Sequence, residues 1–481
     1  MNQDLPTIAA IATAAGVGGI GIVRMSGATA IIIANKLFSS NNCPNLSRLQ
    51  GYNMTYGVIE DKESAGNQSQ KKEIFPISPP IAEENGSNSK SASEIIDEAI
   101  CLVFRSPQSY TGEDVVEFHC HGNQVVLRRV LDAVLRAGAR LAEPGEFTRR
   151  AYLNGRIDLA KAEAVMQLIS AGSEQAARAA TAAMGGALSQ HIAEIRQSLI
   201  AQAAQIAAWV DYPEEEFDDP QTEQIMAVLT AAAEQLNQLI RRSASDQAVI
   251  SGVNTAIVGP PNAGKSSLMN LLAGYDRSIV TELPGTTRDT VTETIQLGSI
   301  TLRLTDTAGL RQTDDLIERI GVERSQAALS SAELVLAVFD IMQPPDDTLL
   351  AQCPPDRTIV VFNKSDLAAE VPPMDFPAPQ VVISALRGEG IEALTQAIEA
   401  LLGASDFSPN EAILANHRQT ETARTTLAAL EDAMQTLSGG FPLDAVSICI
   451  EDAIQALFSL TGERATETVV DEVFASFCVG K

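Results

Sequence analysis

The chain has 481 residues, of which 34 are basic and 61 acidic, so that its formal net charge is −27. A chain of this length is too long for one ordinary core, which predicts two to four domains. The acidic balance argues against a large non-specific nucleic-acid surface and leaves room only for a local basic patch. The six cysteines are scattered without a C-x-x-C pair, which indicates no disulfide framework or zinc site and favours a reducing, cytoplasmic compartment.

Residues 1–125 mix β-rich runs, "GGIGIVRMSG", "EAICLVFRS" and "EDVVEFHCHG", with turns, a pattern typical of a compact α/β domain. The uncharged run from Thr7 to Val23 follows Asp4 and is rich in glycine and threonine. We therefore interpret it as a buried strand and a glycine-rich turn, and not as a signal peptide. Residues 60–96 are polar and rich in serine and asparagine, which predicts a mobile surface insertion. No stretch reaches the roughly 18 apolar residues of a membrane span, so no membrane partner is expected.

Residues 126–248 are rich in alanine, leucine and glutamine with helical spacing, and this periodicity returns in residues 405–481. Between them, residues 249–404 alternate short apolar strands with helical stretches, which predicts a Ras-like, doubly wound α/β domain. Each flanking segment has an apolar face with nothing nearby to cover it. The two are therefore expected to pack together as one discontinuous helical domain, with the α/β domain inserted between them. The acidic run "DYPEEEFDD" at 211–219 is interpreted as a solvated interhelical turn, with a metal site as the alternative.

The stretch "AIVGPPNAGKSS" follows a predicted strand and opens a predicted helix, with the spacing G-x-x-x-x-G-K-S. Glycines at 259 and 264 let backbone N–H groups surround a phosphate, the lysine reaches the terminal phosphate oxygens, and the serine hydroxyl can bind Mg²⁺. The predicted phosphate-contacting residues are Asn262, Ala263, Gly264, Lys265, Ser266 and Ser267.

The stretch "NKSD", at the end of a later predicted strand, indicates the base that is bound. The Asp366 carboxylate can accept both the N1–H and the exocyclic amine of guanine, a donor pair that adenine lacks, so the nucleotide is predicted to be GTP. The predicted base contacts are Asn363, Lys364 and Asp366, with Ser384, Ala385 and Leu386 of "SAL".

Two segments between these motifs carry the expected γ-phosphate and magnesium contacts. "DTAG" supplies a carboxylate on the magnesium side and a glycine amide for the γ-phosphate: Asp306, Thr307, Ala308 and Gly309. "TELPGTTRD" supplies the residues Thr281, Glu282, Leu283, Pro284, Gly285, Thr286 and Thr287. Within it, Thr287 is expected to complete the Mg²⁺ shell with Ser266.

The residue after "DTAG" is Leu310, where Ras-like enzymes place a glutamine that orients water. Asn262 could instead donate an oxygen to a second cation that bridges the phosphates, as an arginine finger would. Glu318 is a candidate to position water, and an ordinary helix-surface carboxylate is the alternative at this stage.

The whole pattern resembles the MnmE (TrmE) family of tRNA-modifying GTPases. The resemblance rests on "TIAAIAT", "GIGIVRMSG", "SYTGEDVVEFHCHGN", "EPGEFTRRAYLNGRIDLAKAEAV", "DYPEEEF", the GTPase motifs and the terminal "CVGK". It implies an N-terminal domain that dimerises and binds 5-formyl- or 5,10-methylene-tetrahydrofolate through Arg24, Glu117, Arg156 and Lys481. It also implies a K⁺ ion held by Asn262, Thr281, Leu283 and Thr286, with Glu318 as the catalytic residue that positions water.

The resemblance further implies that the protein works with a flavin-dependent partner, MnmG, in a heterotetrameric complex. Together they would add an aminomethyl or carboxymethylaminomethyl group to C5 of the tRNA wobble uridine. Cys478 would then lie beside the folate pocket as a candidate catalytic thiol, with a structural thiol as the alternative. Gly480 would allow the close approach of the tail to a ligand.

Two competing interpretations are kept open. An Era-like GTPase could act as a switch in assembly of the ribosome or another RNA particle without base chemistry, although no KH-type "GXXG" loop in a basic setting is present. His119, Cys120 and His121 could suggest a metal site, but strand alternation places the two histidines on one face and the cysteine on the other.

Overall fold

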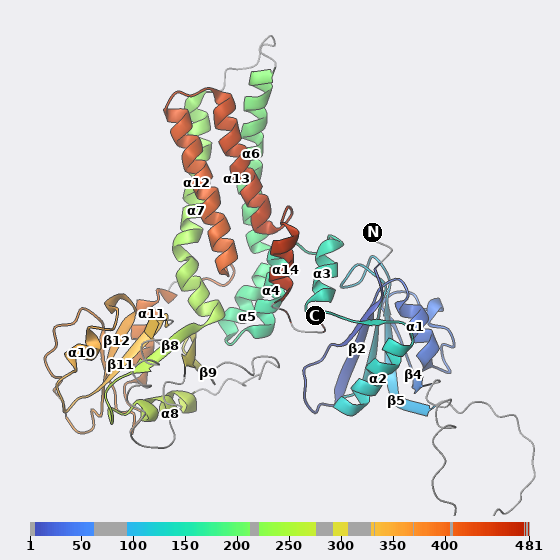
Figure 1. Ribbon diagram of the computed structural model, residues 1–481, viewed down its shortest axis with the longest axis horizontal. Helices are drawn as coiled ribbons and strands as arrows, with labels where there is room; N and C mark the ends of the chain where they lie inside the picture. Colours follow the sequence, from blue (N-terminus) through green and yellow to red (C-terminus); the bar gives the residue numbers. More distant parts are fainter. Residues whose placement is uncertain are drawn as a thin grey trace, which may run out of the picture. The chain divides into compact units, whose positions relative to one another are not determined.

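The computed structural model describes residues 5–61, 94–211, 221–275, 292–305, 329–330, 332–368, 370–404, 407–475, 477 and 480. The chain divides into two compact units, Met1–Ala162 with Thr466–Lys481, and Glu163–Ala465. Many of their helices and strands are labelled in Figure 1.

The first unit is built on a seven-stranded sheet with the order β3-β4-β5-β6-β2-β1-β7. Its described strands are β1 (Ile8–Ile11), β2 (Ile20–Ser26), β3 (Phe38–Ser39), β4 (Asn53–Asp61), β5 (Glu94–Phe104), β6 (Val115–His121) and β7 (Arg140–Leu141). Its helices are α1 (Ala30–Leu37), α2 (Gln124–Arg136), α3 (Glu146–Leu153) and α14 (Glu467–Ala475), with a short 3-10 turn at Leu46–Arg48.

Helices α1 and α2 cover one face of this sheet. Their buried side chains share one apolar cluster with alternate residues of the strands, including Val23, Phe118 and Cys120. The opposite face carries Arg24 and Glu117, which are partners across β2 and β6. Near β1 this open face is covered by α3, where Phe147 packs with Ile8 and Ala10. Period-two alternation therefore separates an apolar core face from a face with polar groups.

The C-terminal tail is anchored against α3 within the same unit. The rings of Phe474 and Phe477 lie 5.0 Å apart between centroids, and the ring of Tyr152 lies 6.3 Å from that of Phe474. Gly480 has φ +98°, and a Cβ at this position would lie 2.3 Å from the carbonyl oxygen of Ile11. Only glycine permits this approach of the tail to β1. The predicted approach of Gly480 to a ligand stays a prediction.

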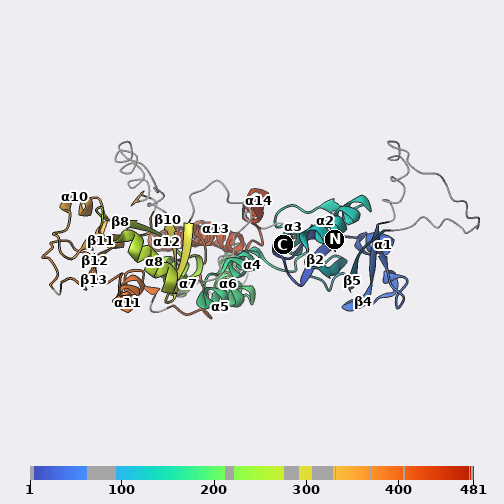
Figure 2. The ribbon, with the colours of Figure 1, turned by 90° about the horizontal axis from the view of Figure 1, so that it is seen from below.

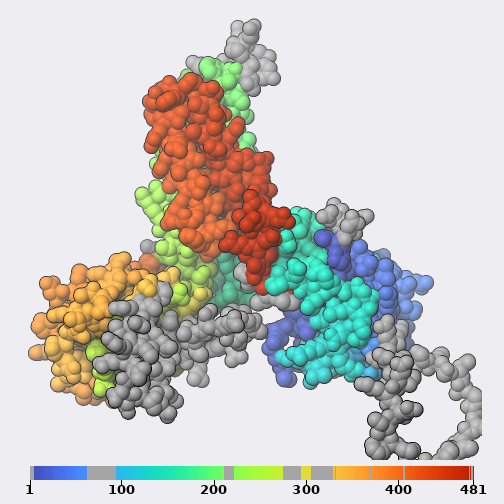
Figure 3. Space-filling model, viewed as in Figure 1, coloured from blue at the N-terminus to red at the C-terminus, as the bar shows by residue number. Residues whose placement is uncertain are grey.

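The second unit contains a bundle of long helices. The described helices of this part are α5 (Glu174–Met184), α6 (Ala187–Asp211), α7 (Thr222–Ser251), α12 (His417–Ser438) and α13 (Leu443–Thr461), preceded by α4 (Leu159–Ser170), which links the two units. Helix α12 packs on α7 and α13 packs on α6. In Figure 3 the red and orange atoms of α12 and α13 form one continuous side of this bundle. The expected pairing of helices from before and after the inserted domain is confirmed.

Arg418, at the start of α12, joins three helices of the bundle. Its guanidinium forms a bidentate ion pair with Glu163 of α4, in which Nε lies 2.7 Å from Oε1 and Nη2 lies 2.8 Å from Oε2. It also donates to the carbonyls of Ser459 and Leu460 at the end of α13, each over 3.1 Å. Carbonyls in the last turn of a helix have no intrahelical partner, so this cation satisfies the end of α13.

The inserted domain contains a six-stranded sheet with the order β13-β12-β11-β8-β10-β9. Its described elements are β8 (Val253–Val258), α8 (Lys265–Tyr275), β9 (Thr292–Leu297), β10 (Ile300–Thr305), β11 (Leu334–Asp340), α10 (Asp347–Leu350), a 3-10 turn at Pro355–Arg357, β12 (Thr358–Asn363), β13 (Gln380–Val382) and α11 (Ile391–Leu401). Only the β9–β10 pair is antiparallel among the described pairs of this sheet.

Two separate apolar clusters cover the two faces of the inserted sheet. One joins the strands to α8 and α11, and the other joins them to α10. Figure 2 shows α10 on one side of β11 and β12 and α11 on the other. Strands buried on both faces are the physical reason for continuous apolar runs such as "LVLAVF", and the predicted doubly wound class is confirmed.

The structure refines two expectations from the sequence. The compact first unit continues past residue 125 and includes α2, β7 and α3, because the apolar face of α2 packs on its sheet. Glu60, Asp61 and residues 94–96 belong to strands β4 and β5, so the predicted insertion is shorter at both ends, and residues 62–93 lie outside the described residues. The turn at 212–220 also lies outside them. In the described part of the chain, the helices are too short or too polar to cross a bilayer.

Candidate functional site

The predicted phosphate loop joins the end of β8 to the start of α8. Gly259 and Gly264 have φ values of +154° and +94°. A Cβ would lie 2.2 Å from the Val338 carbonyl oxygen at the first and 2.1 Å from the Asn363 amide nitrogen at the second. Asn262 also has a left-handed backbone, with φ +63°. Both glycines are therefore required by the packing of the loop as well as by any ligand.

Lys265 lies over this loop at the first position of α8. Its ammonium donates to the carbonyls of Gly259 and Pro260, each over 2.8 Å. Burial lowers the pKa of this lysine, because a half-buried ammonium is poorly solvated. The free N–H groups at the start of α8 and this cation form the kind of site that binds phosphate.

Asn363 ties the predicted base loop to the phosphate loop. Its amide donates to the carbonyl of Ala263 over 3.0 Å. Its amide oxygen accepts from the backbone N–H groups of Lys364 and Ala385, at 2.8 and 3.0 Å. Asn363 is buried, and its contacts with Ala263 and Ala385 join segments that are far apart in the chain.

Asp366, in the predicted base loop after β12, is held by a hydrogen bond from Ser384. The Ser384 hydroxyl donates to its carboxylate over 2.6 Å, and this bond is the main reason that the pKa of Asp366 lies below its usual value. Lys364 has φ +69° and forms an ion pair of 2.7 Å with Asp340. The structure thus brings together the predicted base residues, with Leu386 exposed beside them.

The remaining predicted GTPase residues lie outside the described residues. They are the segment 281–287, the segment 306–309 and Glu318. Strand β10 ends at Thr305, directly before the second of these segments. Ser266 and Ser267 are exposed in the first turn of α8.

In the first unit, the predicted folate residues Arg24 and Glu117 form an ion pair on the open face of the sheet. Arg24 Nε lies 2.7 Å from Glu117 Oε1, and the second carboxylate oxygen lies 3.0 Å from His119 Nε2. Burial opposes ionisation of Glu117, but Arg24 and His119 outweigh it and the pKa of the carboxyl lies below its usual value. An ionised carboxylate and a guanidinium are thus available side by side.

Two aromatic rings contact the Arg24 guanidinium. Its central carbon lies 5.8 Å from the ring centre of Tyr110 and 5.7 Å from that of Phe147. The Tyr110 hydroxyl is bonded to the Thr148 hydroxyl over 2.8 Å, so that α3 fixes both rings. Within the described residues the guanidinium has one hydrogen-bond partner, at Nε. Its two terminal amino groups can therefore serve a ligand.

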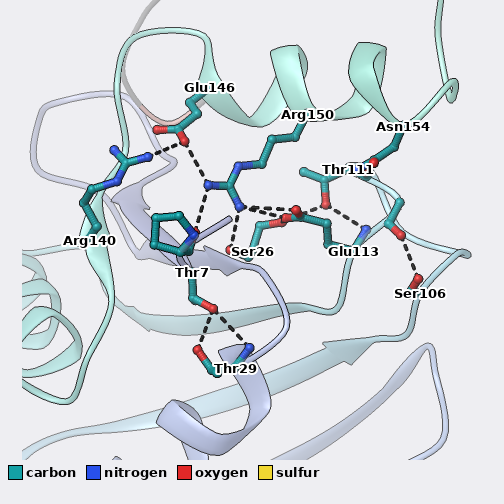
Figure 4. A network of polar contacts seen from close by, with 12 residues as sticks. Thr7, Ser26, Thr29, Ser106, Thr111, Glu113, Arg140, Glu146, Arg150 and Asn154 are labelled. Atoms are coloured by element: carbon teal, nitrogen blue, oxygen red, sulfur yellow. Dashed lines mark hydrogen bonds and ion pairs between the residues drawn. The ribbon is translucent and has the colours of Figure 1, made fainter. Parts of the chain in front are cut away.

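The buried Arg150 organises the loop that carries Tyr110. Its guanidinium is paired with Glu113 at 3.0 Å and Glu146 at 2.9 Å, and it donates to the carbonyl of Pro6 over 2.9 Å (Figure 4). Glu113 also accepts from the Ser26 hydroxyl over 2.6 Å, next to Arg24 on β2. This network joins the start of the chain, β2, the 106–114 loop and α3.

Arg156 is exposed and lies beside the same loop. Its side-chain stem would be 3.4 Å from a Cβ at Gly112. The structure does not describe a contact between Arg156 and the Arg24–Glu117 pair.

Cys478 and Lys481 lie outside the described residues, whereas Phe477 and Gly480 are packed against Gly145 and Ile11.

Sequence reasoning missed Tyr110, Phe147, Arg150 and the contact of His119 with Glu117. All four lie within the quoted runs "SYTGEDVVEFHCHGN" and "EPGEFTRRAYLNGR", but only the pairing of β2 with β6 and the packing of α3 bring them together. The expected alternation is confirmed for Cys120, which lies in the core cluster.

Comparisons with known proteins agree with this architecture. The family described as "GTP-binding protein TrmE N-terminus" matches residues 7–156, and that described as "MnmE helical domain" matches residues 159–478. A protein from Symbiobacterium thermophilum, "tRNA modification GTPase MnmE", is 42% identical over 484 residues, which covers 99% of each chain.

Two further relatives carry the same description. The protein from Lactococcus lactis subsp. lactis is 38% identical and covers 100% of both chains. The protein from Synechococcus sp. is 40% identical and covers 99% of this chain and 98% of its own. The similarity extends over both units and the inserted domain, so the chain belongs to the MnmE family of tRNA modification GTPases.

Proposed function

We propose that the chain hydrolyses GTP in the inserted domain and uses this cycle in modification of a tRNA base. The observation that carries the nucleotide site is the Asn363 amide, which joins the phosphate loop at Ala263 to the base loop at Ala385. A nucleotide bound to both loops would contact one rigid unit, because each loop holds the other. Asp366 would accept from guanine, and Lys265 would exchange the Gly259 and Pro260 carbonyls for phosphate oxygens.

We further propose two cations beside the nucleotide. The donor chemistry fits: the exposed Ser266 hydroxyl lies in the first turn of α8, and Thr287 would complete a Mg²⁺ shell. The Asn262 side chain is exposed on the loop, and no hydrogen bond occupies it within the described residues. Its oxygen, with oxygens of Thr281, Leu283 and Thr286, would hold K⁺. Such a cation supplies positive charge to the transferred phosphate, and Glu318 would position the attacking water.

The open face of the first unit fits a tetrahydrofolate derivative, in its 5-formyl or 5,10-methylene form. The ionised Glu117 suits the adjacent N–H and NH₂ donors of a pteridine ring. The free edge of Arg24, which is ion-paired with Glu117, would donate to the same end of the ligand, and Arg156 and Lys481 would add positive charge for its carboxylates. When bound, this group supplies the one-carbon unit for the base. The residues of this chain would bind and orient it at Glu117 and Arg24, next to the rings of Tyr110 and Phe147 that contact Arg24.

A homodimer through the first unit is supported by apolar side chains on the same open face. Ile20, Met54, Tyr56 and Ile100 are all exposed there, and the strand register places them on the side of Glu117. A second copy of the chain would cover them. We also propose a heterotetrameric complex with MnmG, which would supply flavin chemistry, and a cytoplasmic location.

One pair of measurements tests the function as a whole. Purified full-length protein should hydrolyse GTP and not ATP, and tRNA from a strain that lacks the gene should lose an aminomethyl or carboxymethylaminomethyl group at C5 of the wobble uridine. Loss of ribosome subunits with unchanged wobble nucleosides would instead favour the assembly-switch alternative.

A further inference from the structure

His119 lies on the open face of the first-unit sheet, between Ile22 of β2 and Ile100 of β5. It is two residues from Glu117 on β6 and therefore points to the same side of the sheet. Its Nε2 lies 3.0 Å from Glu117 Oε2, and its side chain is 25% exposed. Because the carboxylate is ionised and can only accept, His119 must carry hydrogen on Nε2 to make this bond.

Arg24 alone does not determine the orientation of Glu117. It contacts one carboxylate oxygen, Oε1, through a single nitrogen. The terminal torsion of a glutamate side chain is broad, so a carboxylate held at one oxygen can still swivel. The bond from His119 holds the second oxygen, and two fixed oxygens define both the position and the plane of the group.

We propose that His119 is a positioning residue for ligand binding by Glu117. An ionised carboxylate offers about four lone-pair sites, of which Arg24 and His119 occupy two. The other two remain available and can accept from adjacent N–H and NH₂ donors of a pteridine. His119 thus sets the plane in which such a ring is bound. This inference rests on the proposed folate site.

His121 offers a matched control on the same strand and face. It also contacts a carboxylate, since its Nδ1 lies 2.7 Å from Asp97 Oδ1. Its side chain is 72% exposed and lies on the far side of His119 from Glu117. It therefore resembles His119 in chemistry but makes no contact with Glu117.

The test is titration of 5-formyl-tetrahydrofolate into the full-length protein by calorimetry, with the thermal transition of each variant as a check of folding. His119→Leu should weaken binding roughly five-fold or more, in the range expected when a hydrogen bond to a charged group is lost. His119→Gln, whose amide can donate from a similar position, should bind within about two-fold of the wild type. His121→Leu should bind as the wild type does.

A double-substitution cycle separates this inference from the site itself. Glu117→Gln should weaken binding strongly, and adding His119→Leu to it should cause little further loss, because His119 acts through Glu117. If Glu117→Gln has no effect, the folate site is wrong and the inference is overturned with it. If Glu117→Gln weakens binding but His119→Leu does not, or if His119→Gln is as weak as His119→Leu, the role of His119 alone is overturned.

Discussion

The Asn363 side chain donates to the carbonyl of Ala263 over 3.0 Å, across 100 positions of sequence. Asn363 ends strand β12 at the start of the base loop and Ala263 lies in the phosphate loop after β8, and these two strands are parallel on either side of β11. Since a Cβ at Gly264 would collide with the same Asn363 amide, this position of the asparagine requires glycine at 264. This contact explains how two short motifs far apart in sequence form one nucleotide site.

Asp366→Asn should change which base is bound. The asparagine oxygen can still accept from N1–H, but its amide donates where guanine also has a donor, so GTP should bind roughly 10- to 100-fold more weakly. Xanthine has a carbonyl at that position and should bind better than guanine. Competition between GDP and xanthosine diphosphate for the variant measures its preference between the two bases. Ser384→Ala, which removes the 2.6 Å bond to Asp366, should weaken GTP by less. Unchanged GTP affinity in Asp366→Asn would place the base elsewhere.

Asn262→Ala should remove activation by potassium. The wild type is expected to hydrolyse GTP faster in K⁺ than in Na⁺ at equal ionic strength, because the larger cation fits the proposed shell. In Asn262→Ala the two rates should be equal and low. Initial rates of phosphate release in K⁺ and in Na⁺ measure GTP hydrolysis for the wild type and the variant. Equal rates for the wild type in the two salts would remove the potassium site from the mechanism.

Arg150→Met should destabilise the first unit by about 3–5 kcal/mol, because Glu113 and Glu146 would be left without their buried cation. Arg149→Met is the matched control: its partner is Asp471, both side chains are much more exposed, and about 1 kcal/mol or less is expected. Hydrogen exchange of the β1 and β2 amides measures the stability of the first unit. The single tryptophan, Trp209 on α6, reports the second unit and should show an unchanged unfolding transition. Equal effects of the two substitutions would contradict the network.

Asp246, buried on α7, should make the second unit less stable as the pH rises. Burial raises its pKa to about 6, Arg242 at 3.9 Å opposes this shift and Glu411 adds to it. Between about pH 4 and 6 the folded protein binds more protons than the unfolded chain, so the free energy of unfolding falls with increasing pH in this window.

Asp246→Asn resembles the protonated form of Asp246. At pH 7 it should therefore stabilise the second unit by about 1 kcal/mol, after allowance for solvent screening. Near pH 4 it should leave the free energy of unfolding unchanged. Urea unfolding followed by Trp209 fluorescence at both values measures the difference. A gain of the same size at both pH values would show that it does not arise from the titration of Asp246.

Cys478→Ser should abolish tRNA modification while it leaves GTP hydrolysis nearly intact. This expectation rests on the family resemblance; the residues that flank position 478 in the sequence, Phe477 and Gly480, pack against Gly145 and Ile11. Nucleoside analysis of tRNA from a deletion strain complemented with the variant measures modification of the wobble uridine. Phosphate release by the purified variant measures GTP hydrolysis. Full modification in the variant would assign the thiol a structural role.

The nucleotide motifs and the helical bundle could be predicted from the sequence because both depend on local patterns. A phosphate loop needs glycines at fixed spacing, and buried strands such as β11 and β12 need continuous apolar runs, so each can be recognised without knowledge of its neighbours. The contact of Gly480 with Ile11 of β1, by contrast, was not predicted, because it depends on where the fold places the tail.

Contacts across strands were decided only by tertiary structure. His119 was recognised as a strand residue, yet its bond to a carboxylate that Arg24 also holds depends on the register of β2 against β6. Arg150 has the appearance of a surface cation in "EFTRRAYL", and its burial follows from the way α3 closes over the sheet. A sequence determines which groups are present and how each segment folds, whereas the electrostatic partners of a charged side chain depend on which distant segments the fold brings within hydrogen-bond distance.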